Sequence, residues 1–285
     1  MIKTVVGHAD AVRALLDDLA RTGGAGSILV VGPEGVGRHH LALAAAAEVV
    51  GARDASALER HPDVHRLDPG TGIDGVRAAI EAMHRRPARA PRQVLVVRDA
   101  DTMSNAALNA MLKLLEEPPG DAAILVVATD PALLPETVVS RCRVVRLKPL
   151  TEAETRRVLE GLGLPGDLAA DAEGSPGRAA YAHEAGVVED VERLLAALER
   201  PRPNALAEAE AVVKGRKDDD AKAQRRRLGE VLRVAAGRLR RGLPASEGLL
   251  RAVVEAAGSL SANGSAKIVL FDLCLEPWRA RKPRR

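Results

Sequence analysis

Residues 27–39 read Ser27-Ile28-Leu29-Val30-Val31-Gly32-Pro33-Glu34-Gly35-Val36-Gly37-Arg38-His39, and an alanine-rich segment follows them. The apolar run predicts a buried strand, the glycines predict a tight loop, and the alanine-rich segment predicts a helix. A strand that leads through a glycine-rich loop into a helix is the setting of a phosphate-binding loop. Glycines suit such a loop because backbone N–H groups reach phosphate only where no side chain intervenes. The alternative for Gly32, Gly35 and Gly37 is a glycine-rich turn that never bound phosphate.

The two positions after Gly37 depart from the phosphate-loop pattern. That pattern has a lysine followed by a serine or threonine, whereas this chain has Arg38 and His39. The arginine fork is bulkier than the lysine ammonium group, which acts as a point charge. The imidazole lacks the hydroxyl that helps to hold Mg²⁺ in such loops. The sequence therefore predicts a degenerate phosphate loop.

A second departure follows the apolar run Val94–Val97. In ATPases with a phosphate loop, a second buried strand leads to an acidic residue that holds the metal. Here the run is followed by Arg98, whose positive charge is wrong for a magnesium shell, and then by Asp99. Asp99 and Asp101 also suit a second role, as caps of the next turn. Two independent departures predict that this chain does not hydrolyse ATP efficiently.

The surrounding sequence alternates strand-length apolar runs with segments of helical periodicity. The runs are Ser27–Val31, Val64–Leu67, Val94–Val97, Ile124–Ala128 and Val144–Leu147. Apolar residues recur at helical spacing in Asp10–Arg21, Ile73–Met83 and Ser104–Glu117, the last with Ser104 as its expected N-cap. This alternation predicts an α/β domain over residues 1–150, in which helices flank a mainly parallel sheet.

The pattern changes near Leu150. Thr151 and Glu154 have the spacing of a capping box, which begins a helix, and the sequence from there on indicates only helices. Residues 151–200 are expected to form a small helical lid domain, and residues 201–285 an all-α bundle with a basic tail, Arg279–Arg285. The helices of that bundle are predicted near residues 205–215, 219–241, 246–260 and 264–276.

The composition narrows the classes of function. The chain has one Phe, one Trp and one Tyr and a formal net charge of +3, so base stacking on aromatic rings cannot be a major mode of binding. No stretch approaches the roughly 20 apolar residues needed to cross a bilayer, and the first residues show no signal-peptide pattern. The two cysteines suggest no disulfide framework. These features predict a cytoplasmic protein.

Three further segments resemble the AAA+ clamp-loader family. Asn109–Pro119 resembles the signature that follows the metal-binding strand, and Ser140-Arg141-Cys142 resembles the Ser-Arg-Cys motif of clamp loaders. Gly174–Arg178 resembles the start of the sensor 2 helix. Within that family, a degenerate phosphate loop beside a retained Ser-Arg-Cys motif is similar to the delta-prime group of bacterial DNA polymerase III. The segment His61–Val64 also looks like that group.

The resemblance implies a non-catalytic structural subunit, a stator, in a complex that loads the sliding clamp on primed DNA during replication. Arg141, with Ser140 and Cys142 as its motif, would be an arginine finger offered in trans to ATP on a neighbouring subunit. A structural arginine at a strand edge is the alternative. Thr129 stands at the sensor 1 position and Arg178 at the sensor 2 position, each either functional or a structural remnant.

The resemblance also implies the partners and cofactors. The partners are the tau/gamma and delta subunits, the sliding clamp, and primer-template DNA contacted through its backbone. Arg77, near a helix start, is the candidate DNA contact, with a solvated helix start as the alternative. ATP and Mg²⁺ would be bound by neighbouring subunits. Many delta-prime chains carry a four-cysteine zinc module, but no cysteine lies between Val49 and Gly70, so no zinc is expected there.

Two other functions compete with the stator. The first is an active clamp-loader ATPase of the tau/gamma type with an unorthodox phosphate loop, and Arg38, His39 and Arg98 argue against it. The second is a free-standing DNA-binding regulator, for which no groove-reading motif is found.

Overall fold

The computed structural model describes residues 5–21, 26–199, 212, 220–242, 247–262, 265–266, 268–270 and 272–274. The chain divides into two compact units. The first comprises Met1–Ala169 with Glu173–Gly177, and the second comprises Ala170–Ala172 with Arg178–Arg285. The short segment Ala170–Ala172 thus packs with the second unit, although both of its neighbours in the chain belong to the first.

The first unit is built on a five-stranded sheet in which every neighbouring pair of strands is parallel. The strands are β1 Gly26–Val31, β2 Val64–Leu67, β3 Val94–Val97, β4 Ala123–Ala128 and β5 Arg143–Arg146, in the spatial order β2-β3-β4-β1-β5. The carboxyl ends of parallel strands meet at one edge of a sheet, where ligands bind in open α/β folds. The candidate phosphate loop after β1 and the Arg98-Asp99 pair after β3 therefore share that edge, with β4 between them.

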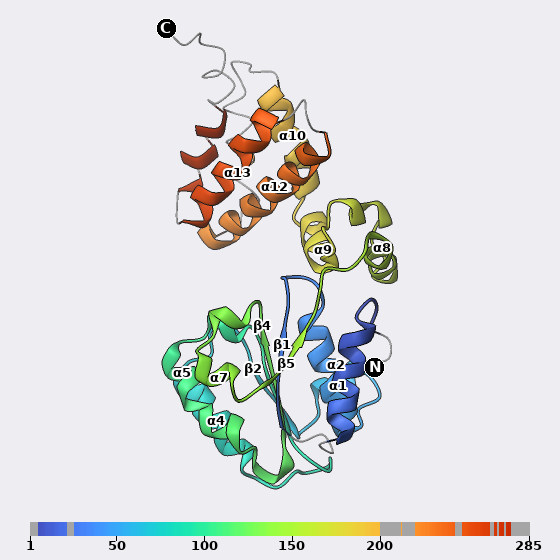
Figure 1. Cartoon of the computed structure of the whole chain (residues 1–285), viewed down its shortest axis with the longest axis vertical. Helices are drawn as coiled ribbons and strands as arrows, with labels where there is room; N and C mark the ends of the chain where they lie inside the picture. The colour runs from blue at the N-terminus through green and yellow to red at the C-terminus, as the bar shows by residue number, and fades with distance from the viewer. Residues whose placement is uncertain are drawn as a thin grey trace. The chain divides into compact units, whose positions relative to one another are not determined.

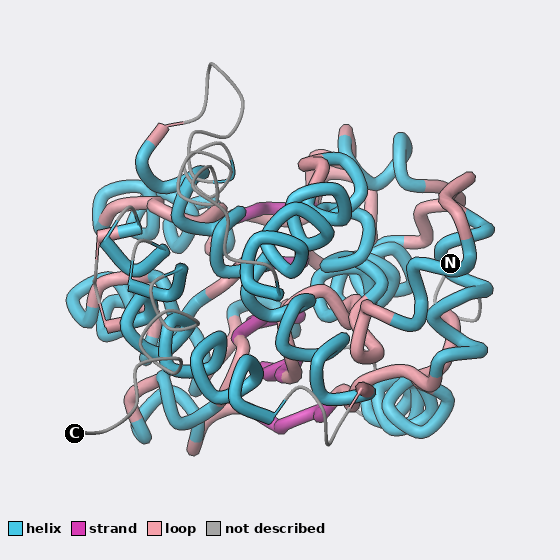
Figure 2. Tube along the Cα trace, turned by 90° about the horizontal axis from the view of Figure 1, so that it is seen from above, coloured by secondary structure: helices cyan, strands magenta, loops and turns pink. Residues whose placement is uncertain are grey.

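Helices cover both faces of the sheet (Figure 1). They are α1 Ala9–Arg21, α2 Arg38–Val50, α3 Ala55–Glu59, α4 Ile73–Met83, α5 Asn105–Ala110, α6 Leu112–Glu116 and α7 Glu136–Val139. Helix α8 Glu152–Gly161 follows in the chain and contributes no residue to the two core clusters on the faces of the sheet. Ile28 and Val30 of β1 pack in one core cluster with α1 and α2, whereas Leu29 and Val31 pack in another with α4 to α7. This alternation follows from the two-residue period of a strand, and Figure 2 distinguishes the strands from the helices.

The structure confirms the α/β fold class that the sequence predicts. Val64–Leu67 and Val94–Val97 agree residue for residue, and the other strands are shifted or extended by one residue. The prediction of one helix over Ser104–Glu117 is wrong, because the chain forms α5 and α6 instead. The break lies at Met111, whose N–H bonds three residues back to Leu108 and so tightens the turn. Ser104 is confirmed as an N-cap, since its Oγ accepts from the N–H of Ala107 at 3.3 Å.

The second unit is helical. From Arg178 onward it contains most of α9 Pro176–Glu184, then α10 Val187–Glu199, α12 Ala221–Arg241 and α13 Glu247–Ser261. An aliphatic core packs these helices together, and a buried ion pair between Arg227 and Asp190 joins α12 to α10. The predicted helices 219–241 and 246–260 thus correspond to α12 and α13. Those predicted near 205–215 and 264–276, and the tail Arg279–Arg285, lie wholly or partly outside the described residues.

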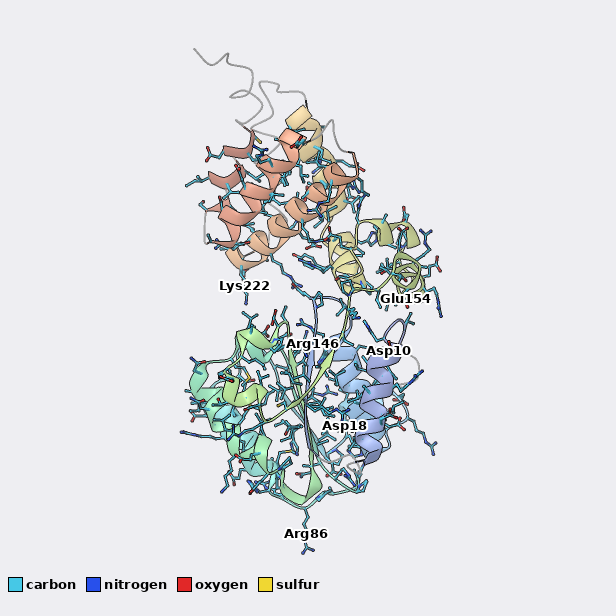
Figure 3. All side chains as sticks on the ribbon, viewed as in Figure 1. Asp10, Asp18, Arg86, Arg146, Glu154 and Lys222 are labelled. Carbon is cyan, nitrogen blue, oxygen red and sulfur yellow. The ribbon has the colours of Figure 1, made fainter. Side chains whose placement is uncertain are left out.

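Helix α8 begins with the predicted capping box. Thr151 Oγ1 accepts from the N–H of Glu154, and Glu154 Oε2, whose residue is labelled in Figure 3, accepts from the N–H of Thr151 at 2.9 Å. Helix α8 packs in the first unit, whereas residues 178–199 belong to the second. The three-domain division with boundaries at 150 and 200 stays a prediction. In the described part of the chain, every helix is too short or too polar to span a membrane.

Candidate functional site

The candidate phosphate loop depends on its glycines. Gly32, Gly35 and Gly37 have positive φ angles of 154°, 80° and 104°. Residues other than glycine rarely adopt such backbone angles. At Gly32 a Cβ atom would also lie 2.7 Å from the carbonyl oxygen of Leu147. The N–H of Gly32 donates to the carbonyl of Thr129 at 3.2 Å, so the end of β4 holds the beginning of the loop.

Two segments that are distant in sequence form hydrogen bonds with the middle of the loop. His8 Nε2 lies in hydrogen-bond contact with the carbonyl oxygen of Val36 at 2.8 Å. The N–H of Gly177 donates to the carbonyl oxygen of Gly35 at 2.9 Å, and a Cβ atom on Gly177 would lie 3.0 Å from the Cα of Gly35. The segment predicted to begin the sensor 2 helix therefore contacts the candidate phosphate loop directly.

The lysine position of the loop holds a buried guanidinium. Arg38, the first residue of α2, is only 7% exposed, and its Nη2 lies 3.8 Å from Asp99 Oδ1. Arg98 Nε lies 3.6 Å from the other oxygen, Asp99 Oδ2. Asp99 adopts a left-handed φ of 44°, which Asp tolerates better than most residues. The carboxylate is thus paired with two cations.

His39 adds no charge to this cluster at neutral pH. Burial, together with the positive charge of Arg98, lowers the pKa of the His39 imidazole, so the neutral form prevails. The resemblance to AAA+ clamp loaders implies bound ATP with Mg²⁺, but these residues do not fit that pair. The loop offers no hydroxyl for the metal, and the carboxylate after β3 is already paired with Arg38 and Arg98.

The two sensor candidates have different surroundings. Thr129 is fixed through its backbone, since its N–H donates to Asp101 Oδ2 at 2.9 Å and its carbonyl accepts from Gly32. Thr129 is thereby brought together with the phosphate loop. Arg178 belongs to the helical unit, where its Nε lies 3.5 Å from Glu230 Oε2 of α12.

Arg141 is held at the surface of the α/β unit by two acceptors. Its Nε donates to Glu116 Oε2 at 3.1 Å, and its Nη1 donates to the carbonyl of Thr137 at 3.0 Å. The side chain is 32% exposed. Ser140 Oγ also donates to the carbonyl of Thr137, at 3.4 Å. Burial raises the pKa of the neighbouring Cys142 thiol to about 12, so Cys142 packs as a protonated, unreactive side chain.

Arg77 lies apart from these groups, on α4. Its Nη1 is 3.5 Å from Asp74 Oδ1, and both side chains are largely exposed. The exposed guanidinium of Arg77 is accessible to a DNA phosphate, but its contact with Asp74 is equally that of an ordinary ion pair one helical turn apart.

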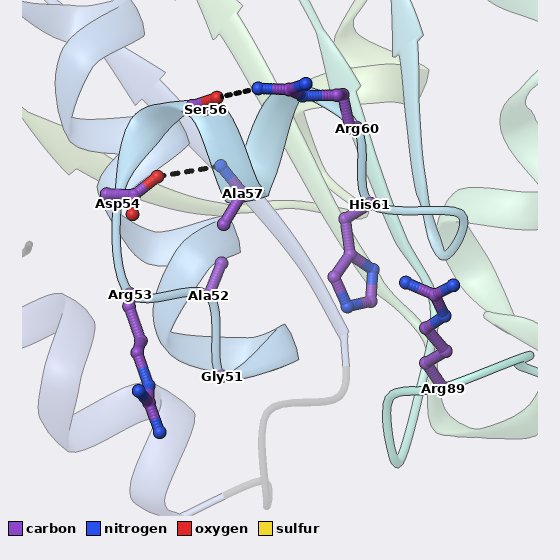
Figure 4. Close-up of a pocket in the computed structure, with 9 residues that line it drawn as sticks. All are labelled: Gly51, Ala52, Arg53, Asp54, Ser56, Ala57, Arg60, His61 and Arg89. Carbon is purple, nitrogen blue, oxygen red and sulfur yellow. Dashed lines mark hydrogen bonds between the residues drawn. The ribbon is translucent and has the colours of Figure 1, made fainter.

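A surface hollow of about 530 Å³ lies over α3, in the segment for which no zinc module was expected. Figure 4 shows that Arg53 and Arg60, which line it, extend in different directions, and Arg60 donates to Ser56 Oγ. The basic groups therefore do not converge on one point. Within the described ranges, no group of three His, Cys, Asp or Glu side chains is arranged to hold a metal ion.

Sequence reasoning missed three residues that shape these sites. Glu116 lies within Asn109–Pro119, whose resemblance to the clamp-loader signature was a signal that pointed to the segment but not to its contact with Arg141. Asp101 is a metal-ligand or turn-cap candidate in the sequence, whereas in the structure it accepts a hydrogen bond from the N–H of Thr129 at 2.9 Å. His8 carries no pattern that links it to a loop 28 residues away.

Comparison with known proteins identifies the family. The family model described as DNA polymerase III, delta subunit, matches residues 7–151, just over half of the 285-residue chain. A DNA polymerase III subunit delta' of Pseudomonas aeruginosa is 31% identical over 199 residues, which cover 59% of this chain and 60% of that protein. Subunit tau of Salmonella typhimurium is 34% identical over 103 residues, which cover 35% of this chain and 16% of that protein. The chain thus spans less than two thirds of the length of these relatives.

A solved structure supports the fold. The DNA polymerase III gamma-subunit-related protein of Thermotoga maritima superimposes with a TM-score of 0.61 at 18% identity, over 94% of this chain and 99% of that one. This likeness confirms the fold, an α/β unit on a parallel sheet followed by helices. The chain therefore belongs to the DNA polymerase III delta-subunit family, and the resemblance to delta-prime clamp-loader subunits is confirmed.

Proposed function

We propose that this chain is a non-catalytic structural subunit, a stator, of the DNA polymerase III clamp loader, which loads the sliding clamp on primed DNA. One observation carries the non-catalytic part. Asp99, the carboxylate nearest to the end of β3, lies 3.8 Å from Arg38 and 3.6 Å from Arg98. A carboxylate in that position normally helps to hold Mg²⁺, and the two guanidinium groups compete with a metal ion for it.

We infer that Arg141 acts in trans, at an ATP site of an adjacent tau/gamma subunit. Its contacts support this role, because they use two of the five N–H donors of the guanidinium and leave the side chain partly exposed. A guanidinium from a neighbour stabilises charge on the transferring phosphoryl group and is worth about 10³–10⁵ in rate. Ser140 and Cys142 complete the motif on which this inference rests.

In this function the chain works within a larger complex. The partners are the tau/gamma and delta subunits, the sliding clamp within the complex, and primer-template DNA contacted through its backbone, with Arg77 as the candidate contact. ATP and Mg²⁺ belong to the neighbouring subunits, Thr129 and Arg178 are sensor remnants, and the complex works in the cytoplasm. Residues 1–150 form the AAA+ domain, 151–200 the lid, and 201–285 the collar.

The test is the variant Arg141→Ala in the reconstituted complex. DNA-stimulated ATP turnover is expected to fall, because the one site completed by Arg141 loses about 10³-fold or more in rate. Assembly, measured by gel filtration, is expected to be unchanged. The matched control is Arg146→Ala, which removes an exposed arginine from β5 (labelled in Figure 3). Unchanged turnover in Arg141→Ala would remove the arginine-finger assignment.

A further inference from the structure

We propose that Glu116 is the positioning residue of Arg141: its carboxylate fixes the direction in which the guanidinium faces a neighbouring subunit. The inference rests on the proposed arginine-finger function and extends it to a second residue. Its starting point is the contact between Arg141 Nε and Glu116 Oε2 at 3.1 Å, across 25 residues of sequence. Glu116 is the last residue of α6, and Arg141 follows α7, so the pair joins two separate elements.

The two acceptors of Arg141 together define the plane of its guanidinium. The group is rigid and planar, with five donors in a fixed geometry. When Nε is bound to Glu116 and Nη1 to the Thr137 carbonyl, the plane cannot turn about the side-chain axis without breaking a bond. Among the described residues no hydrogen bond engages Nη2, which remains available to an anion. An arginine oriented in this way has less freedom to lose when it meets a phosphate.

Both ends of the pair are tied to the core. The carbonyl of Leu115, directly before Glu116, accepts from the buried Ser27 Oγ of β1 at 2.8 Å, and Leu115 itself is buried. On the other side, Val138 and Cys142 flank the Arg141 turn and pack in the core cluster that contains Leu115. The backbone on both sides of the Glu116–Arg141 contact is therefore fixed by the core. Most pairs of long surface side chains lose conformational entropy when they form an ion pair, and a fixed backbone reduces that loss.

Stability does not account for this contact. Glu116 is 59% and Arg141 32% exposed, and exposed ion pairs of this kind contribute little to folding. Glu117 offers a matched control, because it is exposed and carries the same charge on the next residue. In the described part of the chain, the Glu117 side chain makes no hydrogen bond or ion pair.

The experiment compares Glu116→Gln, Glu116→Asp, Glu117→Gln and Arg141→Ala in the reconstituted complex, with kcat and KM of DNA-stimulated ATP turnover as readouts. The contribution of Arg141 to kcat is the difference between wild type and Arg141→Ala. We expect this contribution to be about tenfold smaller in Glu116→Gln, because the guanidinium is held less firmly and a misplacement of about 1 Å can cost up to about 10²-fold. KM for ATP, assembly and the melting temperature of the chain are expected to match wild type. Glu116→Asp should restore part of the loss, and Glu117→Gln should behave as wild type.

Each other outcome overturns a named claim. If Arg141→Ala lowers kcat and Glu116→Gln does not, the positioning role is wrong and the arginine finger stands. If Arg141→Ala changes nothing, the finger is wrong and the positioning role falls with it. The double variant Glu116→Gln/Arg141→Ala is expected to match Arg141→Ala alone. A further loss of kcat in the double variant would show that Glu116 acts on something other than Arg141.

Discussion

At the scale of single residues, the charges around Asp99 carry the proposal that this chain does not hydrolyse ATP. Two unit charges about 4 Å apart interact by about 1 kcal/mol in bulk water and by about 4 kcal/mol near a protein surface. Asp99 has two positive neighbours at such distances, 3.8 and 3.6 Å. A Mg²⁺ ion beside the carboxylate would be repelled by Arg38 and Arg98. Because the ion carries two charges, each repulsion would be twice that between two unit charges at the same distance. The two arginines that pair with Asp99 therefore disfavour the binding of a metal ion there.

Asp63, also at the residue scale, provides a test of the structure through pH. Its buried carboxylate accepts N–H groups of Ala88, Arg89 and Ala90 at 2.5, 2.7 and 2.7 Å. Burial alone would raise the pKa, but the three donors outweigh it and lower the pKa of Asp63 below its ordinary value of 3.8. Because the folded-state pKa is depressed, this carboxylate stabilises the fold above about pH 4, and the stabilisation is lost as pH falls through the lowered pKa.

We expect Asp63→Asn to reduce the free energy of unfolding at pH 7 by about 2 kcal/mol, since an amide NH₂ group would face buried donors. The difference from wild type should shrink as pH falls below about 4. Urea denaturation at both pH values measures it, with the exposed Asp68→Asn as the control, expected within about 0.5 kcal/mol of wild type. Equal effects of the two variants would contradict the buried hydrogen-bond network.

At the scale of elements, the start of α9 and the phosphate loop form one packed contact. We expect Gly177→Ala to destabilise the fold by about 1–2 kcal/mol, because its Cβ would press on the backbone of Gly35 at 3.0 Å. Gly161→Ala in α8 is the control, since a Cβ there meets nothing within 4 Å, and it should be neutral or slightly stabilising. Thermal unfolding measures both; a Gly177→Ala protein as stable as wild type would show that the contact is not tight.

The elements also show what sequence can and cannot predict. Val94–Val97 was predictable because a continuous apolar run indicates a strand that is buried on both faces. The break at Met111 was not, since the apolar period continues through a single tightened turn. The contacts of Arg141 with Glu116 and of His8 with Val36 join residues 25 and 28 positions apart. No short-range sequence pattern predicts contacts over such separations. The motifs therefore identified the candidate sites, whereas the contacts of their residues could be found only in the structure.

At the scale of the whole molecule, the candidate phosphate loop and the Arg141 site differ in their charged contacts. The candidate phosphate loop has glycines with positive φ and lies at the carboxyl edge of the sheet, and Arg38 and Arg98 both pair with Asp99 there. Arg141 keeps a partly exposed guanidinium on anchored elements. Under the proposed stator function, the chain would complete the ATP site of a neighbouring subunit and bind no ATP itself.

The most direct test of that division is an equilibrium titration of the purified chain with a fluorescent ATP analogue and Mg²⁺, combined with a phosphate-release assay. Arg38→Lys/His39→Thr, which restores the phosphate-loop pattern, serves as the comparison protein. We predict no saturable binding of Mg·ATP by the wild-type chain in the micromolar range and no turnover. Micromolar binding accompanied by hydrolysis would contradict the stator and favour an active ATPase of the tau/gamma type.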